Sequence, residues 1–204
     1  MVAVKDGTIT KRTRGYLPHW ERDAETYFVT FRLWDSLPAA ALQEILKHRR
    51  MFDLARRSGR KLLPIESATL HRLSSRKVEA YLDAGSGECL FNRPELAMVV
   101  ADALRHFDGE RYQLEAWCVM PNHVHVLSTL GEGESLAKIV GGWKSVSAHR
   151  IVALLGRRGP IWQAESYDHL VRDEREFDRA VDYIRNNPIR AGLRDWPWVY
   201  VKKK

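Results

Sequence analysis

The stretch "YQLEAWCVMPNHVHVLSTL", residues 112–130, predicts a β-hairpin. Residues 112–120 alternate between the two faces of an extended chain, and the alternation resumes at His123 after Pro121-Asn122. Alternation at period two is the pattern of a strand, and a Pro-Asn pair between two such runs is typical of a tight turn. We therefore expect two antiparallel strands that follow one another directly.

The second of these strands places two histidines on one face. Successive side chains of a strand point to opposite faces, so His123 and His125 share a face, while Val124 and Val126 point into the core. Two imidazoles side by side can chelate a metal ion, and the alternative is a pair of satisfied polar residues. A catalytic metal site usually needs a third protein ligand, which must come from elsewhere in the chain.

Further strands and helices are expected on both sides of the hairpin. Residues 26–34 alternate at period two, and "WPWVYVKK" near the C-terminus has the composition of a short strand. Apolar side chains at spacings of three and four predict helices over residues 94–107, 134–155 and 177–187. Gly141-Gly142 is a weak point in the second helix, and the third should stop before Pro188. Together these elements predict an α+β fold, with helices packed on one face of a mainly antiparallel sheet.

The last helix also presents two residue types that suit a reactive site. At about 100° per residue, Tyr183 and Asn187 project close together on the border of its apolar stripe. An asparagine oxygen suits Mg²⁺ or Mn²⁺, and a tyrosine phenol can act as a covalent nucleophile. The ordinary alternatives are a border tyrosine with its hydroxyl in water and an asparagine that ends a helix before proline.

Length and charge limit the class of protein. The chain has 204 residues, which fits one domain with a large insertion over about residues 39–93. A helix beginning near Ala39 is expected to run into a basic cluster. The formal net charge of +7 favours anionic partners, most often nucleic acid, although solvated helix faces would explain the clusters as well. The main cluster consists of Arg49, Arg50, Arg56, Arg57, Arg60 and Lys61.

The sequence shows no targeting or membrane segment. No apolar run approaches membrane-spanning length, and the basic N-terminal stretch has no signal-peptide core. A cytoplasmic protein is therefore the expectation. Cys89 and Cys118 form no CxxC pair, so a disulfide framework is not expected.

Two motifs taken together resemble a known family. "WCVMPNHVHVL" and "YIRNNPIRAGL" are similar to the single-tyrosine (Y1) HUH transposases of the insertion-sequence 200/605 type, and most similar to the branch called REP-associated tyrosine transposases. HUH denotes two histidines around a hydrophobic residue, here Val124. "SLAKIVGGWKS", "IWQAESYDHLVRD" and "GYLPHWERDAETYFVTFRLWDSLP" also look like that branch. The resemblance covers most of residues 1–204 and is weakest from about 49 to 88.

The resemblance implies a fold, an activity and a set of site residues. The fold is ferredoxin-like (RRM-like), with HUH on a central strand of an antiparallel sheet and helices packed behind. The activity is metal-dependent cleavage and rejoining of single-stranded DNA beside hairpins, with Mg²⁺ or Mn²⁺. The family's tyrosine, which forms a 5′-phosphotyrosine link, matches Tyr183. The family's third metal ligand, after His123 and His125, matches Asn187. Tyr167 is a rival nucleophile, but Val171 stands where a ligand-type residue would follow it.

Other functions and partners remain open from the sequence. A non-catalytic protein that binds nucleic-acid hairpins and a metal-dependent hydrolase of small molecules are the alternatives to an active transposase. Trp143 and Trp162 are candidates for stacking on unpaired bases, although tryptophan is more often a core residue. The protein is expected to be either a monomer or a homodimer.

Overall fold

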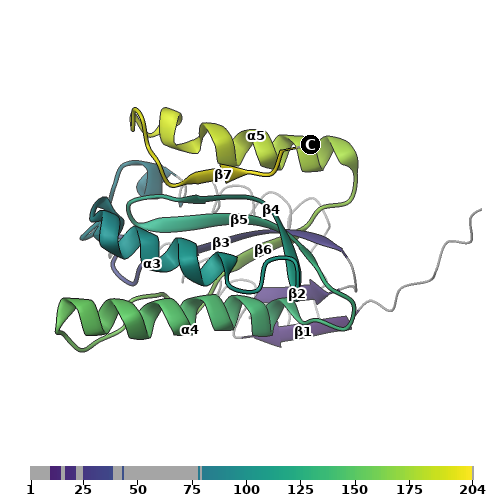
Figure 1. The fold of residues 1–204 in the computed structure, drawn as a ribbon, viewed down its shortest axis with the longest axis horizontal. Helices are drawn as coiled ribbons and strands as arrows, with labels where there is room; N and C mark the ends of the chain where they lie inside the picture. Colours follow the sequence, from purple (N-terminus) through teal and green to yellow (C-terminus); the bar gives the residue numbers. More distant parts are fainter. Residues whose placement is uncertain are drawn as a thin grey trace, which may run out of the picture.

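The computed structural model describes residues 10–14, 17–21, 25–38, 43, 78 and 80–203. Their centre is a five-stranded antiparallel sheet with the strand order β6-β3-β5-β4-β7 (Figure 1). The predicted α+β fold is confirmed, with the histidine strand in the middle of the sheet. The strands are β3 (Thr26–Arg32), β4 (Tyr112–Val119), β5 (His123–Leu130), β6 (Tyr167–Leu170) and β7 (Val199–Val201). A separate two-stranded sheet pairs β1 (Thr10–Arg14) with β2 (Leu17–Glu21).

One face of the large sheet holds most of the apolar core. Helices α3 (Pro94–Arg105) and α4 (Leu136–Leu155) pack there, on the same side as Val29, Val124 and Val126. These three valines are fully buried, as the period-two alternation predicted. Helix α4 runs unbroken through Gly141-Gly142, so the weak point expected there is not a break in the structure.

Helix α5 (Glu174–Arg190) covers the opposite face, which is the face of the two histidines (Figure 1). Its apolar stripe packs on Ala116 and Cys118 of β4 and Leu127 of β5, with Ile184 fully buried. The Asp173 side chain caps the first turn by accepting a hydrogen bond from the backbone N–H of Glu176 at 2.8 Å. Helices α3 and α4 therefore pack on one face of the sheet, as predicted, whereas α5 packs on the other face.

The prediction that the last helix stops before Pro188 is wrong. The helix continues to Arg190, and the backbone N–H of Ala191 bonds to the Asn187 carbonyl at 3.1 Å. Proline lacks an N–H and disrupts the interior of a helix, but in the last turn the loss is confined to one bond. The extra turn matters because it brings Arg190 back over Tyr183.

Several predictions concern residues that the structure does not describe. The helix near Ala39, the basic cluster at residues 49–61 and most of the insertion over 39–93 lie outside the described residues. A short 3-10 helix, η1 (Leu90–Asn92), leads into α3. Cys89 and Cys118 are both free thiols. No helix in the described part of the chain is long and apolar enough to span a membrane.

Candidate metal and nucleophile site

The histidine pair lies at the start of the central strand, fully enclosed. His123 and His125 are each 1% exposed, and their Nε2 atoms are 3.0 Å apart. At that separation one cation could contact both nitrogens. The alternation of the strand therefore puts both imidazoles on one face, with their Nε2 atoms close together.

Neighbouring polar groups hold the far sides of the two rings. The Nδ1 atom of His123 lies 2.7 Å from Asn122 Oδ1, and Asn122 Nδ2 donates to the Ser86 carbonyl at 2.8 Å. Because the Asn122 amide is oriented by Ser86, its oxygen accepts from the Nδ1–H of His123, which leaves the lone pair on Nε2. The Nδ1 atom of His125 lies 2.8 Å from the Thr30 hydroxyl, which can donate or accept.

Both rings are neutral at ordinary pH. Burial lowers the pKa of His125 to about 3, with a smaller contribution from the charge of Arg190. Burial also lowers the pKa of His123 well below its ordinary value, helped by His125 and by the charge of Arg32. A neutral imidazole keeps the nitrogen lone pair that a metal ion binds, so these low pKa values favour metal binding.

Helix α5 brings the two predicted partners to the pair within the same chain. The Asn187 side chain is 1% exposed, with its Nδ2 atom 3.5 Å from His125 Nε2. The Tyr183 ring lies edge-on to the His125 ring at 5.1 Å between centroids, and edge-on to Phe28 at 5.8 Å. The four residues singled out from two separate motifs therefore meet at one place, and no second subunit is needed to bring them together.

The donor set at this place fits a divalent cation. Asn187 Oδ1 is buried and accepts no hydrogen bond from the described residues, an arrangement that costs about 1–3 kcal/mol unless something binds the oxygen. The atom of Asn187 that lies near His125 Nε2 is Nδ2, so a 180° rotation of the amide would exchange the two atoms and turn Oδ1 toward the pair. Two imidazole nitrogens and an amide oxygen would then suit Mn²⁺ or Mg²⁺. No group of three or more His, Cys, Asp or Glu within the described ranges could hold a metal, so the amide is what completes this set.

A thiol beside the pair does not join it. Cys118 is the cross-strand partner of His125 and is fully buried. Burial raises the pKa of this thiol far above its ordinary value, so Cys118 stays protonated. Since a metal ion binds the thiolate, Cys118 acts here as an apolar packing residue.

Two arginines flank the site, and the sequence patterns had not singled them out. Arg32 is the cross-strand partner of His123. Arg190 lies with Cζ 5.3 Å from the centre of the Tyr183 ring. A signal for Arg32 existed, because period two puts it on the same face of β3 as Thr30. Arg190 had none, because Pro188 predicted that the helix would end before it.

Other predicted residues lie away from the pair or in the core. Trp143 and Trp162 are 3% and 7% exposed and belong to the apolar core, which contradicts their role as stacking platforms. Their indole N–H groups donate to Tyr112 and Ser147. The rival nucleophile Tyr167 is the cross-strand partner of Thr30 on β6. Tyr167 therefore shares the histidine face, but two strand spacings, about 10 Å, separate its backbone from that of His125.

Comparison with known proteins points to a family of transposases. Residues 93–187, just under half of the chain, match the family model described as "Transposase IS200 like", and this range includes all four site residues. The resemblance to the IS200-like transposases is confirmed. The chain is 30% identical over 91 residues to a REP-associated tyrosine transposase of Escherichia coli K12, and the alignment covers 43% of this chain and 53% of that protein.

A second curated protein and a solved structure are also similar to this chain. A putative REP-associated tyrosine transposase of Haemophilus influenzae is 29% identical over 105 residues, covering 44% of this chain and 60% of that protein. The alignments therefore span between half and three fifths of the curated relatives. A solved REP-associated tyrosine transposase bound to a REP hairpin has 19% identity and a TM-score of 0.51, covering 93% of this chain and 81% of that one. That likeness shows a shared fold.

Proposed function

We propose that the protein is a metal-dependent transposase or endonuclease that cleaves and rejoins single-stranded DNA next to hairpins. The observation that carries the proposal is the meeting of Tyr183 and Asn187 of α5 with His123 and His125 of β5 in one chain. The IS200-like match and the names of the relatives support DNA strand transfer as the reaction class. Action on DNA implies a cytoplasmic protein.

Tyr183 is the proposed nucleophile. Its phenolic oxygen attacks the scissile phosphorus and forms an O–P bond, while the bond from phosphorus to the 3′ oxygen breaks. The phenol loses a proton and the departing 3′ oxygen gains one, which leaves a 5′-phosphotyrosine and a free 3′-hydroxyl. Because the new ester keeps the energy of the phosphodiester, a 3′-hydroxyl can reverse the step and rejoin DNA without another cofactor.

His123, His125 and Asn187 are the proposed ligands of one Mg²⁺ or Mn²⁺ ion. When bound, such a cation would neutralise negative charge on a non-bridging oxygen of the phosphate. The protein's own contribution is to hold three ligand atoms in a buried place and to keep both imidazoles neutral. Arg190 adds positive charge beside the nucleophile.

The proposed substrate is single-stranded DNA that carries a hairpin. The formal net charge of +7 favours a polyanion, and the solved relative is described with a bound REP hairpin. A monomer would hold a complete site, because all four site residues come from one chain. The alternative hypothesis is a non-catalytic protein that binds DNA hairpins. Tight binding of DNA without cleavage would support it.

The test is a covalent adduct. Labelled hairpin-bearing single-stranded DNA is incubated with the protein and Mn²⁺ or Mg²⁺, and the products are separated under denaturing conditions. The expected result is a metal-dependent protein–DNA adduct that chelation prevents and that Tyr183→Phe abolishes. An adduct that persists in Tyr183→Phe would show that another residue is the nucleophile. Tight binding with no adduct on any hairpin substrate would favour the binding protein.

A further inference from the structure

Arg32 occupies the end of β3, directly beside the histidine pair. It is the cross-strand partner of His123, and Thr30 two residues earlier is the partner of His125. Residues opposite one another in an antiparallel pair have side chains on the same face, about 5 Å apart at Cβ. The half-buried Arg32 side chain therefore starts from the histidine face, on the strand next to that of His123.

The direction of the Arg32 guanidinium is set by Gln163. The Nε–H of Arg32 donates to Gln163 Oε1 at 2.7 Å, and Gln163 Nε2 donates to the Trp34 carbonyl at 3.3 Å. Since the amide oxygen accepts and the amide nitrogen donates, rotating the amide would break both bonds. The backbone N–H of Gln163 also bonds to the Arg32 carbonyl at 3.0 Å, so the two residues are joined at main chain and side chain.

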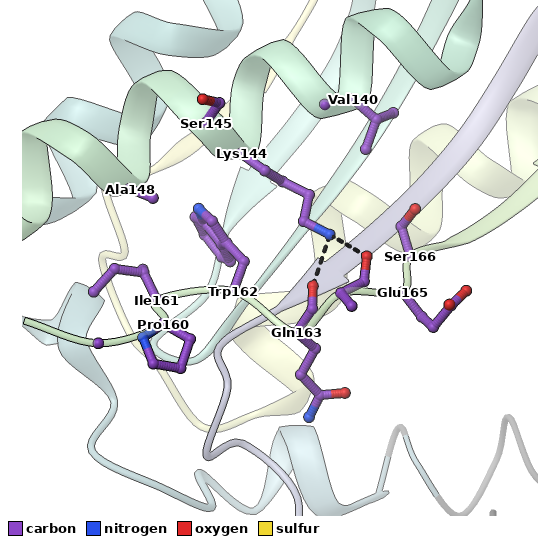
Figure 2. A pocket seen from close by; sticks show the side chains of 13 residues that line it. Val140, Lys144, Ser145, Ala148, Pro160, Ile161, Trp162, Gln163, Glu165 and Ser166 are labelled. Carbon is purple, nitrogen blue, oxygen red and sulfur yellow. Dashed lines mark hydrogen bonds between the residues drawn. The ribbon is translucent and has the colours of Figure 1, made fainter. Parts of the chain in front are cut away.

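The segment that bears Gln163 is itself held in place. Lys144 of α4 donates to the carbonyls of Gln163 and Ala164 at 2.7 and 2.8 Å, across a groove of about 440 Å³ (Figure 2). Figure 2 shows both carbonyl oxygens turned toward the ammonium, while the Gln163 side chain extends away from it. The preceding Trp162 is buried in the core and donates to Ser147 at 3.0 Å. Gln163 is therefore a fixed support for Arg32.

Arg32 brings positive charge to the face of the sheet where the proposed metal ligands lie. A divalent cation bound by His123 and His125 would repel the positive charge of Arg32, which stands opposite His123 on the neighbouring strand. An oxygen of a phosphate placed between the ion and the guanidinium would turn the repulsion into two attractions.

We propose that Arg32, held by Gln163, binds a non-bridging oxygen of the scissile phosphate, and that Gln163 is the residue that positions it. The inference rests on the proposed function of the same site. A guanidinium presents a planar set of N–H donors that matches phosphate oxygens. Pre-orientation by Gln163 means that no side chain has to be reorganised as negative charge moves during cleavage.

The first test measures binding with the nucleophile removed. The cleavage site is mapped with the wild-type protein, and DNA is then made with either a normal phosphate or an uncharged methylphosphonate at that position. In the Tyr183→Phe protein, adding Arg32→Gln should weaken binding of normal DNA about 10- to 100-fold and leave binding of the methylphosphonate DNA nearly unchanged. An equal loss on both DNAs would overturn the proposal.

Two controls locate the effect. With a methylphosphonate one nucleotide away from the cleavage site, Arg32→Gln should again weaken binding, because the scissile charge is still present. Arg150→Gln changes an exposed arginine of α4 that pairs with Asp102 on the other side of the sheet, and should leave both affinities unchanged. If the wild type forms no adduct, the proposed function fails at the mapping step, which separates that failure from failure of the Arg32 assignment.

The positioning role of Gln163 is tested by a double-mutant cycle on the rate of adduct formation. Gln163→Ala should lower the single-turnover rate constant about tenfold when Arg32 is present and have little further effect in the Arg32→Gln protein. A merely structural role would lower the rate constant by the same factor in both backgrounds and would overturn the assignment. Urea midpoints of the four proteins check that each remains folded.

Discussion

Strand β5 has two faces that are equally buried and chemically opposite. Val124 and Val126 point toward α3 and α4 and lie among apolar side chains. His123 and His125 point toward α5, are just as enclosed, and hydrogen bond to side chains of neighbouring residues. Burial on the valine face stabilises the fold by removing apolar surface from water. Burial on the histidine face instead costs free energy, because it suppresses charge and leaves a polar atom of Asn187 without a partner in the described chain.

The two faces of the sheet therefore have different roles. A large apolar cluster on one face holds β3, β4 and β5 together, while a smaller cluster under α5 surrounds the polar site. The stability of the first face permits the second to keep neutral histidines and an amide oxygen that has no partner among the described residues. Changes on the valine face should therefore alter folding, and changes on the histidine face should alter chemistry.

The largest expected effect on folding comes from the valine face. Phe31 is 1% exposed and packs edge-on against Trp162 at 4.8 Å between ring centres. Phe31→Ala should lower the free energy of unfolding by about 3–5 kcal/mol. Met98→Ala, at a residue of α3 that is 51% exposed, should change it by less than about 1 kcal/mol. Urea unfolding at pH 7 measures both, and equal losses would contradict the assignment of the core.

On the histidine face the expected effect is on metal affinity. Loss of an outer-shell partner typically weakens metal binding by about 10–100-fold, and loss of a ligand should cost at least the upper value. His125→Gln should therefore raise the Mn²⁺ dissociation constant by roughly 100-fold or more, as measured by electron paramagnetic resonance titration. His149→Gln, at an exposed histidine of α4, is the matched control and should leave Mn²⁺ affinity unchanged. Equal affinities for all three proteins would place the metal elsewhere.

The same face should make the metal-free protein sensitive to acid. Burial lowers the pKa of His125 to about 3 and lowers that of His123 as well, whereas both titrate near 6.5 in the unfolded chain. Between those pH values the unfolded state binds more protons, so the free energy of unfolding rises with pH. This stability is fully present above about pH 6.5 and is lost as the pH falls, by up to about 1.4 kcal/mol per pH unit for each histidine.

Urea midpoints of metal-free protein between pH 7 and pH 5 measure this slope. The protein that combines His123→Gln with His125→Gln should show a flatter dependence than the wild type. Other titrating groups contribute equally to both proteins and cancel in the comparison. Parallel curves would contradict neutral burial of the pair.

The smallest expected effect is at the rival tyrosine. Tyr167 starts from the edge strand β6, two strands away from His125. Tyr167→Phe should change the yield of covalent DNA adduct by less than about twofold, because the phenol there is not the proposed nucleophile. Peptide mapping of the adduct gives an independent measurement. Loss of the adduct in Tyr167→Phe would reassign the nucleophile to β6.

Periodicity alone could predict which faces the key residues occupy. Period two separates His123 and His125 from Val124, and period 3.6 places Tyr183 and Asn187 at one border of a helix. No periodicity says which face of a sheet a helix covers, so the meeting of the two pairs needed the family resemblance or the structure. That packing is decided by the apolar cluster between α5 and β4, to which Ile184 and Cys118 both belong.

The elements and residues that the sequence did not predict correctly have separate physical causes. Strand β6 escaped prediction because its four residues are all half-buried and show no alternation. Arg190 was missed because proline usually ends a helix, and here α5 tolerates Pro188 in its last turn. Trp143 and Trp162 were candidate stacking residues because sequence alone does not distinguish an exposed indole from a buried one. Their burial follows from the packing of α4 and of residues 159–166 on the core.

The central claim is that the histidine face holds one divalent cation against α5. Anomalous diffraction at the manganese edge, on crystals soaked in Mn²⁺, tests it most directly. We expect one strong anomalous peak in contact with the Nε2 atoms of His123 and His125 and with the side-chain oxygen of Asn187. Manganese density elsewhere, with none between the two Nε2 atoms at saturating Mn²⁺, would contradict it.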